Sequence, residues 1–421
     1  MGKHRISTET KGKKGGRGMS EWKKVKLGQL YEVHNGLSKG RQFFGTGFPF
    51  LTFSNVFNNW FLPDQLESLV QTTDKEREAC SIKAGDVFIT RTSETMDELG
   101  MSSVALKDYP NATYNGFTKR LRPITNRVNP RYIGYYLRTP KFRGQFMAFS
   151  SMTTRASLAN NDLLNMEVEL PSMEIQHRIA TILSRYDSLI ESHLKQIKLL
   201  EEAAQRLYKE WFVDLRFPGH ENTKIVDGVP EGWERKKVNS IIELQSGFAF
   251  KSSTFDDNGT YKIVTIKNVK DGAFDGDNVS KIVAIPDKMP KHCILADGDI
   301  LLSLTGNVGR VCIVNGKSYL LNQRVAKLAT DYKAFTYCLF RSRDMFIEVN
   351  NLANGAAQQN VSPIRIGEMK ILLPNSELLQ EFESIVFKSI ARIISLQSQL
   401  HLLTEARDRL LPKLMSGDIE I

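Results

Sequence analysis

The amino-acid sequence predicts an α+β protein with two similar β-rich globular domains separated by two long helices, which pack as an antiparallel coiled coil with pseudo-two-fold symmetry. Three observations lead to this prediction. Blocks of sequence recur about half a chain length apart, each copy begins with short β-branched and aromatic runs between turn residues, and each copy ends in a long apolar stripe with the helical period.

The repeat is visible without gaps at the start of the two copies. Residues 20–36 (SEWKKVKLGQLYEVHNG) align with residues 231–247 (EGWERKKVNSIIELQSG), which places Trp22 opposite Trp233. Four further pairs follow in the same order: LTFSNV (51–56) with VTIKNV (264–269), GDVFITRTS (85–93) with GDILLSLTG (298–306), YNGFTKRL (114–121) with LNQRVAKL (321–328), and MEVELPSMEI (166–175) with MKILLPNSEL (369–378). The offset changes only between blocks, as expected when insertions fall in loops.

The β-rich part of each copy is about 150 residues long, and a helical stripe follows it. We therefore expect the following division: a disordered basic extension over 1–18, a first globular domain over 19–170, a spacer helix over 171–216, a linker over 217–230, a second globular domain over 231–373 and a C-terminal spacer helix over 374–421.

Both helices are predicted from apolar residues that recur about every 3.6 positions. Pro171 and Pro374 stop helix formation upstream, and Ser172 and Ser376 are the expected N-caps. The residues expected to form the helix–helix interface are Ile175, Ile179, Ile182, Ile190, Ile197 and Leu207 in the first helix, and Leu378, Phe382, Ile385, Ile393, Leu400 and Leu410 in the second.

A helix of about 40 residues is about 60 Å long, which exceeds the width of a domain of about 150 residues. Neither stripe can bury its whole apolar face on its own domain. Two similar stripes in one chain are therefore expected to pack on each other. Ser389, Gln397 and Arg407 interrupt the second stripe and predict polar spots in that interface.

Composition indicates an anionic partner and a reducing compartment. The formal net charge is +10, and about half of it lies in residues 1–18, which have no place in the repeat. No apolar run is long enough for a membrane span, so we expect a cytoplasmic protein with no membrane partner. The four cysteines form no Cys-x-x-Cys pair, which argues against a structural zinc site and a disulfide framework.

Motifs for catalysis are missing from the sequence. There is neither a dinucleotide-binding glycine fingerprint nor a phosphate-binding loop, and the seven histidines show no close metal-ligand spacing. NPRY (129–132) is only partly similar to the adenine-gripping motif of amino-methyltransferases, and Pro130 favours an element boundary there. The sequence thus predicts a binding protein with no catalytic, cofactor or metal site of its own.

Polar turns that recur at equivalent places are the expected binding surface. Arg and Lys can bond guanine edges, Asn and Gln can bond adenine, and Lys, Ser and Thr often hold phosphates. The candidate DNA-binding residues are Lys39, Arg41, Arg91, Thr92, Ser93, Arg155, Lys251, Ser252, Thr305, Asn307, Arg310, Gln323 and Arg324.

Four stretches carry a family resemblance, in the order expected for the family. They are LPSMEIQHRIATIL (170–183), LYKEWFVDLRFPG (207–219), VPEGWERKKV (229–238) and RDRLLPKLMSGDIEI (407–421). Residues 19–421 resemble the DNA-specificity subunit of Type I restriction–modification systems.

The resemblance implies two target-recognition domains that read the halves of a bipartite, asymmetric double-stranded DNA site. It also implies docking of two adenine-N6 methyltransferase subunits and of restriction subunits that translocate DNA. S-adenosylmethionine, ATP and Mg²⁺ would be bound by those partners and not by this chain. Three alternatives stay open at this point: a stand-alone or fused methyltransferase or nuclease, a scaffold that binds protein, and a specificity subunit that pairs with a fused nuclease–methyltransferase.

Overall fold

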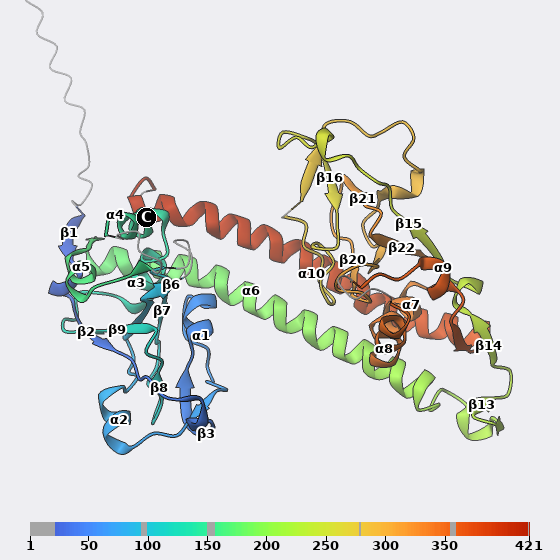
Figure 1. Ribbon diagram of the computed structural model, residues 1–421, viewed down its shortest axis with the longest axis horizontal. Helices are drawn as coiled ribbons and strands as arrows, with labels where there is room; N and C mark the ends of the chain where they lie inside the picture. The colour runs from blue at the N-terminus through green and yellow to red at the C-terminus, as the bar shows by residue number, and fades with distance from the viewer. Residues whose placement is uncertain (1–21, 94–98, 150–155, 278, 354–358, 420) are drawn as a thin grey trace, which may run out of the picture. The chain divides into compact units, whose positions relative to one another are not determined.

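A computed structural model describes residues 22–93, 99–149, 156–277, 279–353, 359–419 and 421 (Figure 1). The chain forms two units. The first contains the residues up to Asp187 together with Ala406–Ile421, and the second contains Ser188–Glu405. Within the described ranges, none of the helices combines the length and apolar character required to cross a membrane. Residues 1–18 lie outside the described part, and the domain boundaries expected from the sequence stay predictions.

The first unit is built on a four-stranded antiparallel sheet with the order β2-β9-β5-β7. Its strands are β2 (Tyr31–Asn35), β9 (Thr118–Pro123), β5 (Val87–Thr90) and β7 (Ser102–Val104). A three-stranded sheet has the order β4-β3-β8, in which β3 (Phe44–Leu51) pairs antiparallel with β4 (Leu69–Val70) and parallel with β8 (Thr113–Tyr114). Two small pairs complete the unit: β1 (Lys23–Lys26) with β11 (Glu167–Leu170), and β6 (Thr92–Ser93) with β10 (Ala156–Ser157).

Short helices connect these strands. They are α1 (Phe53–Asn58), α2 (Asp74–Ala79), α3 (Pro130–Tyr136), α4 (Pro140–Phe149) and α5 (Asn160–Asn165). Helix α3 begins at Pro130, and the Asn129 side chain accepts hydrogen bonds from the amides of Arg131 and Tyr132. NPRY is therefore a capped helix start, as Pro130 predicted.

The second unit repeats this topology. Its main sheet has the order β15-β22-β19-β20, formed by β15 (Glu243–Ser246), β22 (Val325–Ala329), β19 (Ile300–Ser303) and β20 (Val311–Ile313). Its other sheet has the order β17-β16-β21-β18, formed by β17 (Ser280–Ile282), β16 (Tyr261–Val264), β21 (Tyr319–Leu321) and β18 (Ile294–Leu295). Strands β14 (Glu234–Lys237) and β23 (Lys370–Leu373) pair as β1 and β11 do. The remaining elements are β12 (Ile225–Val226), β13 (Val229–Pro230), α7 (Lys333–Arg341), α8 (Arg343–Asn351) and α9 (Pro363–Gly367).

The recurring Gly-Asp pair marks the same buried turn in both units. Gly85 and Gly298 have φ of +89° and +83°, which glycine adopts without strain. The carboxylate of Asp86 accepts the amide of Lys83 at 2.8 Å, and that of Asp299 accepts the amide of Ala296 at 2.8 Å. Both aspartates are buried, so each needs a cation as well.

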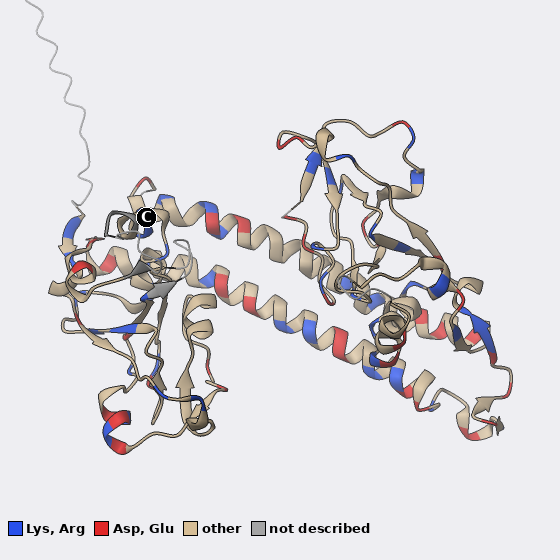
Figure 2. Cartoon of the chain, viewed as in Figure 1, with Lys and Arg blue, Asp and Glu red and all other residues tan. Residues whose placement is uncertain are grey.

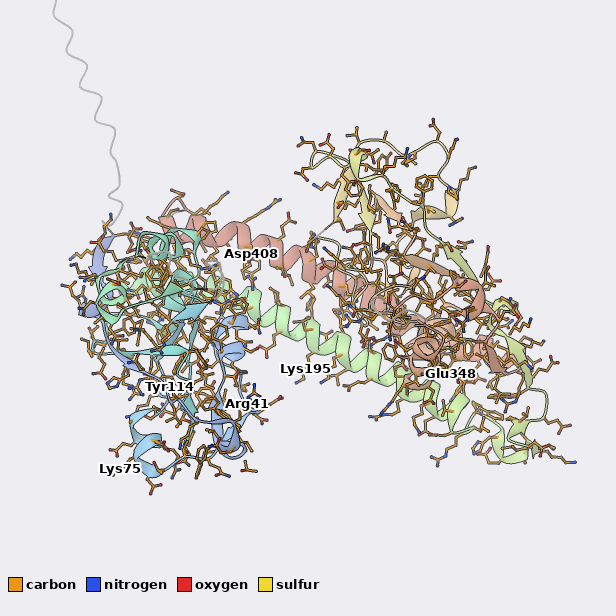
Figure 3. The ribbon with its side chains drawn as sticks, in the orientation of Figure 1. Arg41, Lys75, Tyr114, Lys195, Glu348 and Asp408 are labelled. Carbon is orange, nitrogen blue, oxygen red and sulfur yellow. The ribbon has the colours of Figure 1, made fainter. Side chains whose placement is uncertain are left out.

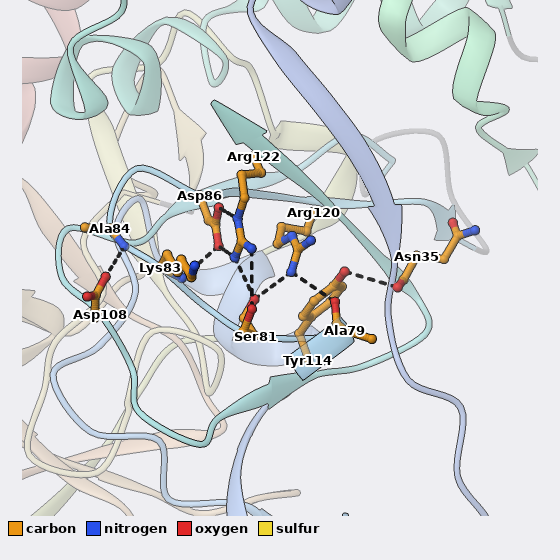
Figure 4. A network of polar contacts seen from close by, with 10 residues as sticks. All are labelled: Asn35, Ala79, Ser81, Lys83, Ala84, Asp86, Asp108, Tyr114, Arg120 and Arg122. Atoms are coloured by element: carbon orange, nitrogen blue, oxygen red, sulfur yellow. Dashed lines mark hydrogen bonds and ion pairs between the residues drawn. The ribbon is translucent and has the colours of Figure 1, made fainter. Parts of the chain in front are cut away.

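In the first unit the cation is Arg122 on β9, whose Nε and Nη2 donate to Asp86 at 2.8 and 2.6 Å (Figure 4). In the second unit Lys327 on β22 pairs with Asp299 at 2.9 Å. The same figure shows Arg120, 2 % exposed, donating to the carbonyl of Ser81. Because Asp86 and Asp299 are each satisfied by a main-chain amide and a cation, the two Gly-Asp turns hold the sheets together and their carboxylates are not free to bind a ligand.

The Thr-x-x-Asn repeat, Thr52 with Asn55 and Thr265 with Asn268, also has a structural role. The amide of Thr52 donates to the Asn55 side chain at 3.0 Å, and the amide of Thr265 donates to that of Asn268 at 2.8 Å. The two blocks therefore recur because each closes the turn after the parallel strand, β3 or β16.

Two long helices, α6 (Met173–Tyr208) and α10 (Ser376–Ser416), each contribute to both units. In the second unit His193 on α6 contacts Gln399 on α10 at 2.9 Å, and the rings of Tyr208 and Phe382 lie 6.3 Å apart. From the first contact to the second, the residue number rises on α6 and falls on α10. This confirms the predicted antiparallel pairing. Charged residues of both signs lie along α6 (Figure 2).

Two details of the helix prediction are wrong. The amide of Leu378 donates to Oδ1 of Asn375 at 2.9 Å, so Asn375 is the N-cap of α10 and Ser376 is its first residue. Ile385 is 45 % exposed, whereas Val386 is buried with Phe382 and Ile390. These three side chains are four residues apart, and Ile385 falls outside the face that they form.

The other predicted interface residues are buried or partly buried: Ile175, Ile179, Ile182, Ile190, Ile197, Leu207, Leu378, Phe382, Ile393, Leu400 and Leu410. In the second unit Tyr208 and the turn after it fill the core with aromatic rings. Phe212 lies 4.9 Å from Phe382 and 5.1 Å from Phe335, and Phe217 lies 5.0 Å from Trp233. The stretches around Phe212 and Trp233 are therefore core residues of the second unit.

Candidate nucleic-acid interface

At one end of the main sheet in the first unit, the hydrogen-bonded turn after β8 brings together three other segments, which contain Leu37, Arg91 and Leu158. The Asn115 side chain accepts the amide of Phe117 at 2.8 Å, and its carbonyl accepts the amide of Thr118 at 3.2 Å. The amide of Leu37 donates to the carbonyl of Tyr114 at 2.8 Å, and that of Arg91 donates to the carbonyl of Phe117 at 3.0 Å.

The carbonyl of Arg91 in turn accepts the amide of Leu158 at 3.1 Å. We call the resulting region, formed by residues 37–41, 91–93, 115–119 and 158–160, the first loop face. It contains Lys39, Arg41 and Arg91 of the predicted set, and the main chain of Thr92 and Ser93. Residue Arg155 lies outside the described residues.

The second unit builds the same arrangement from equivalent residues. The amide of Phe248 donates to the carbonyl of Leu321 at 2.9 Å, and that of Leu304 donates to the carbonyl of Arg324 at 3.0 Å. The amide of Val361 donates to the carbonyl of Leu304 at 2.9 Å. We call residues 248–252, 304–307, 322–324 and 359–361 the second loop face.

A glycine next to each face allows two backbones to approach closely. A Cβ atom at Gly36 would lie 2.0 Å from the carbonyl oxygen of Asn115, and one at Gly247 would lie 2.2 Å from that of Asn322. Neither distance is possible without displacing the backbone. The paired Gly36 and Gly247 of the sequence repeat are therefore required for the shape of the faces.

Two cations lie close together in the first loop face. Lys119 is 4 % exposed and donates from Nζ to the side chain of Asn160. Burial, followed by the nearby charge of Arg91, lowers the pKa of the Lys119 amine. Nε of Arg91 is buried without a hydrogen-bond partner. Two desolvated positive groups, one with a free donor, form a surface that an anion such as a DNA phosphate would stabilise.

The two remaining cations of the first loop face, Lys39 and Arg41, differ in whether the side chain already has a charged partner. Nζ of Lys39 pairs with Glu76 on α2 at 2.8 Å and lies 4.9 Å from the centroid of the Phe43 ring. The hydrogen bond from Lys39 is the main cause that lowers the pKa of Glu76. Arg41 is exposed and begins the short helical turn Arg41–Phe43, where its side chain is available to a ligand (Figure 3).

The second loop face presents a different set of side chains. Lys251, Ser252, Asn307, Gln323 and Arg324 are exposed. Arg310, which precedes β20, is half-buried, and its amide bonds to the hydroxyl of Ser303 at 3.0 Å.

Thr305 corrects the predicted set. It is 7 % exposed, and its hydroxyl donates to Oδ1 of Asn360 at 2.7 Å. This hydrogen bond joins two segments of the second loop face and occupies the Thr305 hydroxyl. Thr305 therefore positions its neighbours and does not contact a base.

The sequence analysis missed Phe117, Lys119 and Asn160 in the first face. Phe117 is 60 % exposed, and the other two form the buried polar contact beneath it. A signal for Phe117 was present, because it follows the repeated Asn115 and stands opposite Arg324 in the second copy. No repeat marks Asn160, whose role depends on the tertiary fold.

Within the described part of the chain, no three His, Cys, Asp or Glu side chains are arranged to hold a metal ion. What the two faces offer is guanidinium, ammonium, amide and hydroxyl groups on hydrogen-bonded loops, together with one exposed aromatic ring. These groups suit the recognition of phosphates and base edges.

Comparison with known proteins agrees with this chemistry. The family model described as Type I restriction modification DNA specificity domain matches residues 19–202 and 230–402. The Type I restriction enzyme MjaIX specificity subunit of Methanocaldococcus jannaschii is 27 % identical, and the match covers 100 % of this chain and 99 % of the relative. The Type I restriction enzyme HindI specificity subunit of Haemophilus influenzae is 22 % identical over 95 % of this chain and 100 % of the relative.

Among solved structures, the S subunit of a Type-I restriction-modification system from M. genitalium has a similar fold, with a TM-score of 0.59. The identity is 16 %, and the match covers 94 % of this chain and 96 % of that one. Taken with the family match over most of the chain, the repeated domains and the paired helices, these findings show that the chain belongs to the DNA-specificity subunits of Type I restriction–modification systems, which are recognition subunits and not enzymes.

Proposed function

We propose that the two loop faces are the DNA-reading surfaces of this specificity subunit, and that each takes one half of a bipartite, asymmetric double-stranded target. One observation carries the proposal. The same backbone hydrogen bonds build both faces, yet the exposed side chains differ: Arg41 and Phe117 in the first, Asn307, Gln323 and Arg324 in the second. A shared scaffold with different contact groups is what reading two different half-sites requires.

The side chains of the loop faces divide into those that suit phosphate contacts and those that suit base contacts. Lys119 is a buried cation and Arg91 a half-buried one, and the pair suits a phosphate, which positions the duplex without specifying its sequence. Exposed Arg, Asn and Gln side chains suit base edges, where a good bidentate contact discriminates by about 1–3 kcal/mol. A single face with a few such contacts selects poorly among genomic sites, so a second face in the same chain adds specificity.

The continuous helices α6 and α10 support the bipartite part of the proposal, because each contributes residues to both units. A stiff connection of this kind sets the number of unread base pairs between the half-sites. We further propose that two adenine-N6 methyltransferase subunits and the restriction subunits dock on this chain, and that they bind S-adenosylmethionine, ATP and Mg²⁺.

A domain exchange tests the half-site assignment. Residues 20–170 are replaced by the matching segment of another family member, and the chimera is expressed with its methyltransferase subunit. Sequencing of the methylated genome should show a change in one half of the target and the same gap as before. Alteration of both halves, or of neither, would contradict the proposal.

A charge variant tests the contact surface. Arg41→Ala should weaken DNA binding by the methyltransferase complex by about 1–3 kcal/mol and relax the base preference at one position of the target. Arg127→Ala is the matched control, because Arg127 is exposed in the same unit but follows the opposite end of β9. Equal effects of the two substitutions would exclude the first loop face as the contact.

A further inference from the structure

Phe117 and Arg324 occupy the same backbone position in the two loop faces. Each follows the repeated asparagine by two residues, and its amide donates to that asparagine's Oδ1, at 2.8 Å for Phe117 and 3.4 Å for Arg324. Each carbonyl accepts an amide from the loop after the central strand, that of Arg91 at 3.0 Å or that of Leu304 at 3.0 Å.

The asparagines themselves are held in the same way. The amide of Asn115 donates to the carbonyl of Leu51 at 3.1 Å, and that of Asn322 donates to the carbonyl of Val264 at 3.1 Å. Their own carbonyls accept the amides of Thr118 and Val325 at 3.2 and 3.0 Å. The turn is therefore fixed on both sides by the main chain and by an asparagine that both copies share.

Both side chains at this position are exposed. Phe117 is 60 % exposed, although an aromatic ring of this size is ordinarily buried, and Arg324 is exposed as well. Neither side chain is needed to build the turn, because the hydrogen bonds come from main-chain groups and from the asparagine. The position presents a side chain outward, and the two copies differ there in chemical class.

The neighbouring position is less free to vary. A Cβ atom at Gly116 would lie 2.4 Å from the hydroxyl oxygen of Ser38, so a larger residue before Phe117 requires the Ser38 side chain to move. In the second unit that position is Gln323, whose amide donates to the carbonyl of Phe248 at 3.1 Å. At the position of Phe117 and Arg324, both units leave the side chain exposed.

We propose that residues 117 and 324 occupy an equivalent specificity-determining position (the slot), which occurs once in each loop face. Arg324 selects a guanine through its O6 and N7 acceptors, and Phe117 selects a thymine through apolar contact with its methyl group. The inference deepens the function proposed above and rests on it. It assigns the difference between the two half-sites, at one base pair in each, to a single exchange of residue on a common turn.

The test uses the complex of this chain with its methyltransferase subunits and a pool of DNA targets randomised in both half-sites. Arg324→Gln should reduce the preference for guanine by roughly tenfold or more at one base pair and favour adenine there, because glutamine bonds the adenine edge. Arg324→Lys should keep the guanine preference. Phe117→Arg should replace a thymine preference with a guanine preference in the other half-site.

Two control variants make the same chemical changes elsewhere. Ile124→Arg introduces a guanidinium at a position that is 57 % exposed beyond the far end of β9, and Arg235→Gln removes one from the exposed strand β14. Both should leave the selected target unchanged.

The possible outcomes separate the two proposals. Unchanged base preferences in the 117 and 324 variants, with DNA binding that still depends on Arg41, would overturn the slot and leave the loop faces as the DNA contact. A uniform loss of affinity for all sequences, in a variant that melts like the parent, would identify a phosphate contact and also overturn it. If Arg41→Ala has no effect either, the proposed function itself fails.

Discussion

Arg407 on α10 donates from Nη1 to Oδ1 of Asp187 on α6 over 2.9 Å, within the first unit. The same aspartate accepts a hydrogen bond from the hydroxyl of Tyr135 on α3, and the Arg407 guanidinium lies 5.3 Å from the centroid of the Trp60 ring. Burial, and then the bond to Asp187, raise the pKa of Tyr135. The polar interruption that the sequence shows at Arg407 is thus a site where both long helices and the globular part of the unit meet.

Replacement of Arg407 by alanine should lower the free energy of unfolding of the chain by about 2–3 kcal/mol, because it leaves the Asp187 charge without its partner in a partly buried site. The side chains of Arg407 and Asp187 are 14 % and 26 % exposed. Lys198→Ala is the control, since Lys198 and Glu202 are 76 % and 53 % exposed and lie 3.8 Å apart; it should cost less than about 0.5 kcal/mol. Denaturant titration measures both, and equal losses would argue against a structural role for the pair.

Alanine at Gly36 or Gly247 should distort the loop face of its own unit only. The added methyl group collides with the carbonyl of Asn115 or Asn322, so each variant should lose affinity for one half-site and melt earlier. Gly144→Ala is the opposite control: Gly144 lies inside α4 with no atom within 4 Å of the added Cβ. That change should stabilise the chain by up to about 1 kcal/mol. Thermal melting and half-site binding would check this, and unaltered binding by both face variants would refute it.

The stability of the second unit should depend on pH through Glu383. Its carboxylate accepts the amides of Ala334 and Phe335 at 3.0 and 2.7 Å at the start of α7, yet burial outweighs these bonds and raises its pKa. Because the pKa of Glu383 is raised in the folded state, the protonated carboxyl favours folding. This contribution to the free energy of unfolding is complete at pH values below the ordinary glutamate pKa, and it is lost as the pH rises through the pKa of the folded state. Relative to Glu383→Gln, the parent should therefore gain stability as the pH is lowered from neutral towards that range. Melting curves of the two proteins at several pH values measure this difference, and a constant difference would contradict it.

Lengthening both long helices together should lengthen the unread gap of the DNA target. His193 and Gln399 contact each other across α6 and α10, so seven residues inserted after each preserve the facing surfaces over two helical turns. The added length is about 10 Å, which corresponds to about three base pairs. Methylation mapping should show a longer gap between unchanged half-sites. Insertion into α6 alone breaks the pairing and should abolish methylation, whereas an unchanged gap in the double insertion would rule out a spacing role.

Local signals in the sequence were sufficient for much of the fold. The repeated Gly-Asp and Thr-x-x-Asn blocks mark turns whose main-chain bonds depend on those residue types, so their recurrence reports a recurring structure. The pairing of the two long helices also follows from their apolar period and length, whereas their antiparallel direction is seen in the contacts of the structure. Register within a stripe is less secure, because Ile385 and Val386 differ by one position and only packing against the β-rich part of the second unit decides which is buried.

The candidate site was harder to predict, because exposure and pairing there depend on residues distant in sequence. Thr305 is of a residue type that often contacts DNA, but its hydroxyl donates to Asn360, which lies 55 residues away in the sequence. Lys119 is buried against Asn160, and Arg91 keeps an unpaired donor, only because several loops converge. Phe117 has no hydrogen-bonding group in its side chain, so the residue types that bond base edges do not include it.

The first unit includes Ala406–Ile421, which follow the whole of the second unit in the sequence, and Leu411, Leu414 and Met415 are part of its hydrophobic core. On a translating ribosome, the earliest globular portion would thus have to wait, incompletely packed, until residues 406–421 have been synthesised. A chain that terminates between residues 187 and 406 would leave that portion with an exposed apolar surface, and we expect proteases and chaperones to remove such fragments.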